Sequence, residues 1–221
     1  MSSRTLAVFD FDHTITECDT AARFFVWLLR RRLWRLAVAA LALPLIGPLF
    51  LVRPCRRIPV RFGVWLATFG VTHKELFGLA RAHVMELVAE SAPLLRSDAR
   101  ARIALHQAQG DVVVVATGAL EFLAHEILLA GGASNVEVVG SSVRKRWGGM
   151  VVRQHCIGKQ KLSMLEARGF SAPFTYVYSD HSKDLPLLEA GEQRYIINPQ
   201  ARCAEFLSTR LGASALVLSW E

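Results

Sequence analysis

The sequence of 221 residues predicts an α/β fold, a doubly wound parallel sheet with a helical cap inserted between its first and second strands. Short apolar runs bounded by turn residues indicate buried parallel strands, because helical stretches separate them along the chain. One long segment, from about residue 17 to residue 89, contains no such run and is rich in Leu, Ala, Phe, Trp and Arg. Strands that alternate with helices are typical of a doubly wound sheet.

Four apolar runs are the predicted core strands: residues 5–9, 111–116, 174–178 and 194–198. Residues 120–132 and 161–169 show helical spacing, and each stretch ends on glycine as a helix commonly does. Residues 136–153 carry Gly148 and Gly149 between two β-rich arms, which predicts a hairpin appended to the sheet. We therefore expect a core of residues 1–18 and 90–221 and a helical cap of residues 19–89.

The net positive charge of the chain comes entirely from the cap. Between Thr20 and His73 the sequence has nine arginines and no acidic residue, so 26 − 9 = 17 basic residues face 19 acidic residues in the remainder. Residues 36–52 form an uncharged apolar run of 17 within this segment. Such an uneven charge distribution predicts an anionic partner, and we expect an anionic membrane surface to bind residues 23–61.

The segment has two other possible interpretations. Residues 36–52 could be a buried cap helix beneath a solvated charged face, but a cap of this size has little interior. Nucleic acid is not expected, because the arginines flank an uninterrupted apolar run. The run is shorter than the roughly 20 residues of a straight span, and proline breaks regular helices. We therefore expect a re-entrant or interfacial hairpin that turns at Pro44, Gly47 and Pro48, with Arg30–Arg35 and Arg53–Arg57 on the same membrane side.

The cysteines and residues 1–4 indicate in which cellular compartment the protein is expected. Cys18, Cys55, Cys156 and Cys203 form no CxxC pair, which argues against a zinc site or a disulfide framework and for free thiols. Residues 1–4 lead directly into the first apolar run, so no cleavable signal peptide is expected. We expect the cytoplasmic side of the inner (plasma) membrane, with a soluble cytoplasmic protein as the alternative.

Polar residues suited to phosphate chemistry follow three of the predicted strands. Asp10 and Asp12 follow the first, Thr117 the second and Asp180 the third. These side chains should converge, because ligands bind at the carboxyl ends of parallel strands. Clustered carboxylates repel one another, and a hard divalent cation, most simply Mg²⁺, relieves that repulsion.

The same residue types suggest how a phosphomonoester would react. An aspartate carboxylate can accept a phosphoryl group as a nucleophile, and a second carboxylic acid can protonate the leaving alkoxide and later activate water. Thr117, the backbone N–H of Gly118 and a lysine could stabilise charge on the phosphoryl oxygens.

Four segments resemble the motifs of haloacid dehalogenase phosphatases. FDFDHTIT (residues 9–16) resembles the DxDxT motif, and VVVVATGA (112–119) resembles the second motif. HCIGKQKLSMLE (155–166) resembles the third motif, which carries a lysine, and YSDHSKDLPLLEA (178–190) resembles the fourth, DxxxD motif. The resemblance implies a Rossmann-like core, a covalent aspartyl-phosphate and Mg²⁺ as cofactor.

The resemblance also implies a role for each matching residue. Asp10 is the nucleophile and a metal ligand, and Asp12 is the general acid/base, whose carbonyl binds the metal. Thr117 and Lys161 bind the phosphate, with Lys159 as the competing choice for the lysine. Asp180 ligates Mg²⁺ directly, and Asp184 acts through water or by holding the lysine. His13 departs from the pattern, since many relatives have glycine there.

The small helical cap resembles the phosphoserine-phosphatase-like branch. Within that branch the sequence is similar to the membrane-associated phosphatidylglycerophosphatase C group, which combines an apolar cap segment with a C-x-G-x-x-K motif, here Cys156, Gly158 and Lys161. This implies hydrolysis of an anionic phospholipid phosphate such as phosphatidylglycerophosphate. The alternatives are a soluble phosphatase for phosphoserine-like substrates and a non-catalytic membrane-binding protein on a degenerate phosphatase core.

Overall fold

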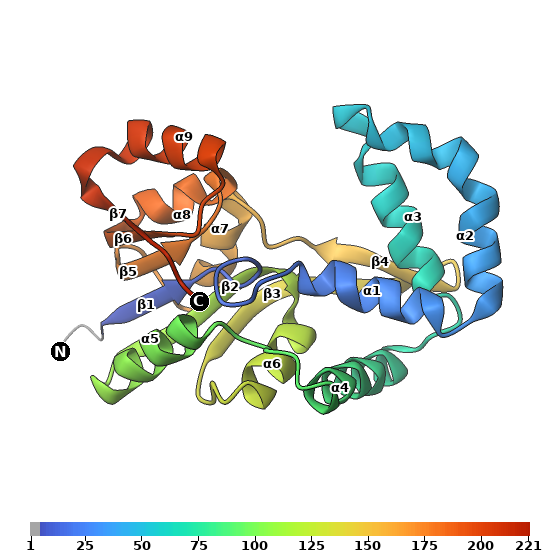
Figure 1. The fold of residues 1–221 in the computed structure, drawn as a ribbon, viewed down its shortest axis with the longest axis horizontal. Helices are drawn as coiled ribbons and strands as arrows, with labels where there is room; N and C mark the ends of the chain where they lie inside the picture. The colour runs from blue at the N-terminus through green and yellow to red at the C-terminus, as the bar shows by residue number, and fades with distance from the viewer. Residues whose placement is uncertain (1–4) are drawn as a thin grey trace.

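A computed structural model describes residues 5–221, apart from the side chain of Arg53. The expectation drawn from residues 1–4 therefore lies outside the described residues. A seven-stranded sheet forms the centre of the molecule, in the order β4-β3-β2-β1-β5-β6-β7 (Figure 1). Its pairs are parallel except for β3 and β4. The strands are β1 (Leu6–Phe9), β2 (Val112–Leu120), β3 (Glu137–Arg146), β4 (Gly149–Gln154), β5 (Phe174–Ser179), β6 (Gly191–Ile197) and β7 (Ala215–Leu218).

The predicted fold class is confirmed. The four predicted core strands are β1, β2, β5 and β6, and the predicted hairpin is β3–β4. Two features were not predicted: strand β7, and the parallel pairing by which the first half of β3 extends the core sheet beside β2.

Helices cover both faces of the sheet because neighbouring strand residues point to opposite sides. Phe9 and Val113 lie in one apolar cluster with α5 and α6, whereas Val8 and Val114 lie in another with α7, α8 and α9. The helices of the core are α5 (Ser97–Ala108), α6 (Glu121–Ala130), α7 (Lys159–Ala167), the 3₁₀ turn η3 (Ser182–Asp184), α8 (Leu185–Glu189), α9 (Ala201–Leu211) and the 3₁₀ turn η4 (Gly212–Ser214).

The segment between β1 and β2 is helical, as predicted, up to α5. It comprises α1 (Thr20–Arg30), α2 (Leu33–Ile46), the 3₁₀ turns η1 (Gly47–Phe50) and η2 (Arg53–Cys55), α3 (Arg57–Ala67) and α4 (His73–Ala89). Asp19 caps α1 by accepting a hydrogen bond from the N–H of Ala22, and Thr72 and Glu75 form a capping box on α4. Helices α2 and α3 form an arm that projects away from the sheet (Figure 1).

The expected turn in the middle of the apolar run is wrong. Helix α2 continues through Pro44 to Ile46, and η1 follows it directly, so the chain reverses only after Phe50. Proline removes one backbone donor from the helix, but the N–H of Gly47 still bonds to Leu43 O. Pro48 stands at the start of η1, where no donor is needed.

The base of the arm is tied to the hairpin and to α1. The hydroxyl of Thr68 accepts a hydrogen bond from the N–H of Met150 at 2.8 Å, and Trp65 Nε1 donates to Trp147 O at 3.0 Å. Any Cβ at Gly149 would lie 2.5 Å from Trp65 O, so only glycine permits this approach. Buried Arg35 donates to Leu28 O at 3.1 Å and to Phe69 O at 2.8 Å. The insertion therefore contacts β4 closely.

Candidate active site

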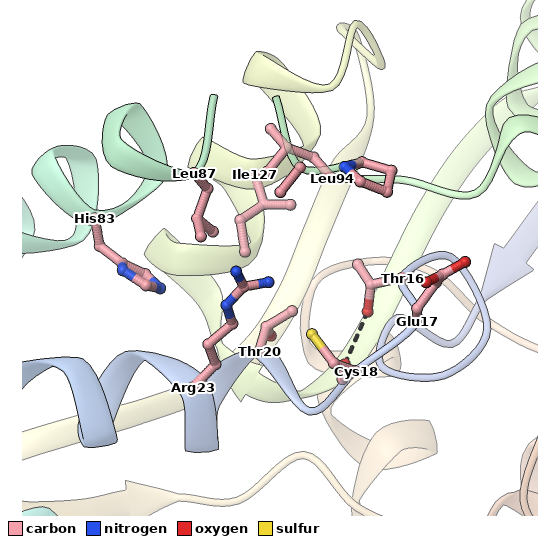
Figure 2. A pocket seen from close by; sticks show the side chains of 11 residues that line it. Thr16, Glu17, Cys18, Thr20, Arg23, His83, Leu87, Leu94 and Ile127 are labelled. Atoms are coloured by element: carbon pink, nitrogen blue, oxygen red, sulfur yellow. Dashed lines mark hydrogen bonds between the residues drawn. The ribbon is translucent and has the colours of Figure 1, made fainter. Parts of the chain in front are cut away.

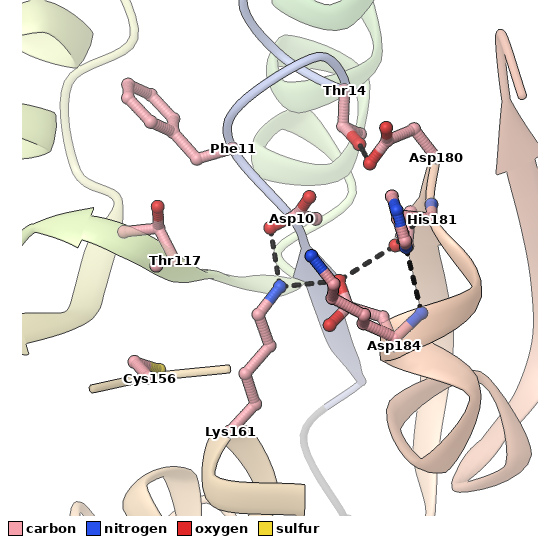
Figure 3. Close-up of polar contacts among 12 residues, drawn as sticks. Asp10, Phe11, Thr14, Thr117, Cys156, Lys161, Asp180, His181 and Asp184 are labelled. Carbon is pink, nitrogen blue, oxygen red and sulfur yellow. Dashed lines mark hydrogen bonds and ion pairs between the residues drawn. The ribbon is translucent and has the colours of Figure 1, made fainter. Parts of the chain in front are cut away.

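Asp10 and Lys161 form the centre of the site. Asp10 directly follows β1, the middle strand of the sheet, and is 8% exposed. Lys161 Nζ lies 2.5 Å from Asp10 Oδ1 and 2.6 Å from Asp184 Oδ2 (Figure 3). Gly158 precedes α7 with a φ of +57°, and this helix directs Lys161 into the interior whereas Lys159 is exposed. Lys161, not Lys159, is thus the lysine of the site.

The charges in this cluster do not cancel. Burial raises the pKa of Asp10 well above that of a free carboxyl, Lys161 opposes this rise, and Asp184 and Asp180 add to it. Burial would lower the pKa of Lys161, but Asp10 and Asp184 raise it, so its ammonium stays protonated. One ammonium therefore stands among three carboxylates, and a nucleophilic Asp10 must be ionised. Further positive charge is required.

The donor chemistry fits Mg²⁺ as that charge. The carboxylates of Asp10 and Asp180 and the backbone carbonyl of Asp12 would hold the ion, which takes oxygen ligands and keeps several waters. No three His, Cys, Asp or Glu side chains among residues 5–221 are arranged to hold a metal by themselves, so a carbonyl and water would have to complete the ligand set. Asp184 is committed elsewhere, because Ser179 Oγ donates to the same Oδ2 that Lys161 binds, at 2.9 Å. Holding the lysine is the second of the two roles expected for Asp184.

Asp12 faces the first turn of α1. Its Oδ1 accepts from the N–H of Thr20 at 2.9 Å and from the Thr20 hydroxyl at 2.7 Å. Burial raises the pKa of Asp12, while the two hydrogen bonds from Thr20 lower it. A carboxyl with a raised pKa retains its proton more readily, which suits a general acid.

Thr117 and Gly118 occupy the end of β2. Thr117 is fully buried, its Oγ1 accepts from the N–H of Ala119 at 2.9 Å, and Figure 3 shows it beside Asp10 and Lys161. Gly118 O accepts from Ser141 Oγ at 2.8 Å, and Ser141 Oγ also accepts from the N–H of Cys156 at 3.0 Å. These bonds fix the second and third motifs against each other, so that a phosphate at Asp10 would be surrounded by donors.

Three contributing residues were missed from sequence. Ser179 orients Asp184, Thr14 Oγ1 lies 3.5 Å from Asp180 Oδ1, and Thr20 holds Asp12. Thr14 and Ser179 lie inside the first and fourth motifs, so the motif match could have identified them. Thr20 lies outside the motifs, and nothing in the sequence indicates its role. His13 has a φ of +62°, a left-handed conformation that glycine adopts most readily. The conformation therefore suits the glycine of many relatives, and histidine is among the other residues that adopt it more often than most.

The sequence profile of haloacid dehalogenase-like hydrolases matches residues 7–189, which span most of the chain. The chain belongs to the haloacid dehalogenase-like hydrolase family. The match covers the first three motifs, the fourth up to Glu189 and the whole insertion, so the resemblance noted from sequence is confirmed at the level of the family. The prediction that the protein is an enzyme is also confirmed.

Solved structures share the fold of this haloacid dehalogenase-like hydrolase. A protein of unknown function from Bordetella pertussis Tohama I superimposes with a TM-score of 0.71 at 23% identity, covering 97% of this chain and 99% of that chain. Cytosolic 5′-nucleotidase IIIB bound to cytidine has a TM-score of 0.59 at 14% identity, covering 98% and 80%.

A phospho-aspartyl intermediate analogue of phosphoserine phosphatase has a TM-score of 0.56 at 13% identity, covering 98% of this chain and 94% of that chain. At these identities the structures show a shared fold. The family and this fold together support a phosphatase.

Proposed function

We propose that this hydrolase cleaves the phosphomonoester of an anionic phospholipid, such as phosphatidylglycerophosphate, at the cytoplasmic face of the inner membrane. The observation that carries the lipid assignment is α2, an exposed apolar helix on the projecting arm. The chemistry follows from Asp10, Asp12 and Lys161, and the substrate class follows from the arm and from the cationic groups between the arm and the site.

In the first step, a carboxylate oxygen of Asp10 bonds to phosphorus while the bond from phosphorus to the ester oxygen breaks. Asp12 gives its proton to the departing alkoxide, so the alcohol leaves neutral. Lys161 balances charge on Asp10 and the phosphoryl oxygens, and Thr117 and the N–H of Gly118 donate to those oxygens.

In the second step, the ionised Asp12 takes a proton from water, whose oxygen bonds to phosphorus. The phosphorus bond to Asp10 then breaks, which releases inorganic phosphate and restores the carboxylate. Mg²⁺, when bound at Asp10, Asp180 and the Asp12 carbonyl, supplies positive charge that neutralises the phosphate.

Cationic side chains near the third motif favour a substrate with a second negative charge. Helix α3 packs along β4, and β4 leads into His155 and the loop before Lys161. Burial lowers the pKa of His155, and the charges of Arg57, Lys183 and Arg61 lower it further. Arg57 and Arg61 are one helical turn apart and therefore share a face of α3. A diester phosphate next to the scissile monoester would satisfy these charges.

The arm supplies the apolar part of the argument. The stretch Leu33–Phe50 is long and apolar enough to cross a membrane by length and composition, yet only 6% of it is buried. Leu41, Leu45 and Leu51 are 82%, 81% and 83% exposed. A helix that is apolar on all sides is ordinarily buried in a core or in lipid, and large exposed apolar patches mark interaction sites.

Arginines stand at both ends of this helix, where anionic head groups would hold them. The chain reverses after Phe50, at a turn that carries Arg53, Arg56 and Arg57. Because these charges stay near the head groups, an arm that lies at the membrane interface is favoured over a re-entrant hairpin that enters the hydrocarbon. In that position lipid acyl chains would stay in the membrane while the head group reaches Asp10.

The test is a panel of phosphomonoesters assayed with Mg²⁺ in mild detergent: phosphatidylglycerophosphate, glycerophosphate and phosphoserine. We expect the highest kcat/KM for the lipid. Arg57→Gln with Arg61→Gln should lower kcat/KM for the lipid by about tenfold or more, the loss expected for a charge-assisted contact, and leave glycerophosphate nearly unchanged. Arg100→Gln, exposed on the core and outside the insertion, is the matched control.

Two other results would replace this proposal. A higher kcat/KM for phosphoserine or glycerophosphate, together with a protein that stays in the supernatant without detergent, would identify a soluble phosphatase. Vesicle binding without turnover of any phosphomonoester would identify a non-catalytic membrane-binding protein.

A further inference from the structure

A cavity lies where the insertion joins the core, on the side of α1 lined by α4 and α6. It has a volume of about 130 Å³ and lies between the two segments that connect insertion and core, residues 16–20 and 92–94 (Figure 2). Asp10, Lys161, Asp180 and Asp184 do not line it. Thr20 does, and Thr20 also holds Asp12. The cavity is therefore separate from the catalytic cluster, and Thr20 connects it to the general acid Asp12.

His83 contributes a buried polar atom without a partner. Its side chain comes from α4, is 3% exposed and lines the cavity, and its Nδ1 has no hydrogen-bond partner within the described part of the chain. Burial lowers the pKa of His83 to about 4, and the charge of Arg23 contributes, while Glu86 opposes the shift. The imidazole is thus neutral near pH 7 and offers one N–H donor. An unsatisfied buried polar group is costly, so a ligand that pairs with it gains affinity.

Arg23 supplies an unmatched positive charge. It lies on α1 one turn after Thr20, and its guanidinium points into the cavity between Thr20 and His83 (Figure 2). Across residues 5–221, the Arg23 side chain makes no hydrogen bond or ion pair, and only its backbone N–H donates, to Asp19 O at 3.1 Å. Glu17, the acidic residue at the rim, has its Oε1 3.6 Å from Arg96 Nη1 instead. The cavity therefore presents a guanidinium and a neutral imidazole with no acid between them.

We propose that this cavity is a binding site for a phosphate-sized oxyanion, held by Arg23 and His83. Its volume of about 130 Å³ exceeds the roughly 30 Å³ that one water molecule occupies in the liquid. Phosphate and sulfate share the required chemistry, and phosphate is also the product of the proposed reaction. A bound anion would fix the first turn of α1 against α4 and keep Asp12 on Thr20. Because Asp12 has to reach first the alkoxide and then water, an anion that fixes α1 and Thr20 would restrict Asp12 and slow turnover without competing with substrate.

Binding is tested by NMR on the ring nitrogens of His83, which needs no turnover. Phosphate and sulfate are titrated into the full chain at constant ionic strength, with chloride as the balancing ion. We expect saturable shifts of the His83 signals with both oxyanions. Arg23→Gln should weaken binding by about tenfold or more, the loss of one charge-assisted hydrogen bond. Arg30→Gln, an arginine of the same helix that does not line the cavity, should bind as the wild type does.

Unchanged His83 signals, or equal weakening in Arg23→Gln and Arg30→Gln, would overturn the proposal. Kinetics add a second readout, and only this readout rests on the proposed phosphatase activity. Sulfate should lower kcat as well as raise KM in the wild type, and Arg23→Gln should lose the effect on kcat while the competitive effect at Asp10 remains. Inhibition that is purely competitive in the wild type would contradict the regulatory role, and the NMR titration would still decide binding.

Discussion

Thr20 holds Asp12 with two hydrogen bonds to a single carboxylate oxygen, at 2.9 Å from its N–H and 2.7 Å from its hydroxyl. Asp12 belongs to the core and Thr20 to the first turn of α1. The general acid is therefore attached to the insertion that carries the arm, and a movement of α1 would change the position of Asp12.

Thr20→Val removes the hydroxyl and keeps a β-branched side chain. The hydroxyl bond lowers the pKa of Asp12, so its loss should raise that pKa. Asp12 must be protonated to act as the acid, and activity falls as pH rises through its pKa. That fall in kcat/KM should therefore move to higher pH in Thr20→Val. Thr20→Ser should keep the wild-type profile, and a shift to lower pH would refute the assignment.

Asp10→Asn should reduce kcat by at least about a thousandfold, because the amide cannot accept the phosphoryl group. Lys161 keeps its contact with Asp184, so the fold and vesicle binding should persist, as circular dichroism and co-sedimentation can check. Beryllium fluoride, which mimics the aspartyl-phosphate, should inhibit the wild type. More than trace turnover in Asp10→Asn would rule out covalent catalysis.

Asp12→Asn should behave differently from Asp10→Asn. The nucleophile remains, so slow phosphorylation of Asp10 is expected, while the loss of the acid and base produces a large drop in rate. Rapid-quench analysis with labelled substrate should detect the phosphoprotein in Asp12→Asn and none in Asp10→Asn. Wild-type rates in Asp12→Asn would assign the proton transfer to another group.

Removal of Mg²⁺ by EDTA should abolish activity, and added Mg²⁺ should restore it. Asp180→Asn should raise the Mg²⁺ concentration for half-maximal activity by about tenfold or more. Asp184→Asn, which loosens Lys161, should lower kcat with little change in that concentration. Activity restored by Zn²⁺ alone, or identical metal dependence in the two variants, would contradict the assigned roles.

Arginine charge at the arm should govern attachment to anionic vesicles. Arg31 is a poor target because it pairs with Glu86 at 3.2 Å, so Arg30, Arg32 and Arg56 are changed to Glu. This variant should be released from anionic vesicles, since each basic residue near such a surface contributes about 1 kcal/mol. Hydrolysis of glycerophosphate should be nearly unchanged. Arg100→Glu with Arg202→Glu, both exposed on the core, is the control, and equal release there would exclude a specific role for the arm.

His83 should make the fold sensitive to acid. Its pKa is about 4 in the folded protein and about 6.5 when unfolded, so the unfolded chain binds the proton first. Stability is therefore lost as pH falls from about 6.5 towards 4. Between pH 7 and pH 5, the free energy of unfolding measured with urea should fall by about 2 kcal/mol less in His83→Gln than in the wild type. Exposed His73→Gln should follow the wild type, and parallel curves for His83→Gln would contradict the shift.

The sequence by itself determined the fold class and the chemistry of the site. Strands β1, β2 and β5 are short apolar runs, and Asp10, Thr117 and Asp180 stand where those runs end. The carboxyl ends of parallel strands meet at one edge, so the predicted parallel sheet was enough to place these residues at one end of it. The helical insertion was equally readable, because it lacks strand-like runs.

Tertiary packing decided what local pattern could not. Lys161 and Lys159 have similar local sequence, and only the contact of Lys161 with Asp10, across 151 residues, distinguishes them. Helix α2 passes Pro44 because one lost donor does not outweigh the remaining helical bonds. The Thr20–Asp12 pair depends on the angle at which α1 leaves the core, and the unpaired His83 depends on how α4 packs against α1. Periodicity records which side of an element is apolar, whereas contacts between distant side chains arise only once the elements have packed.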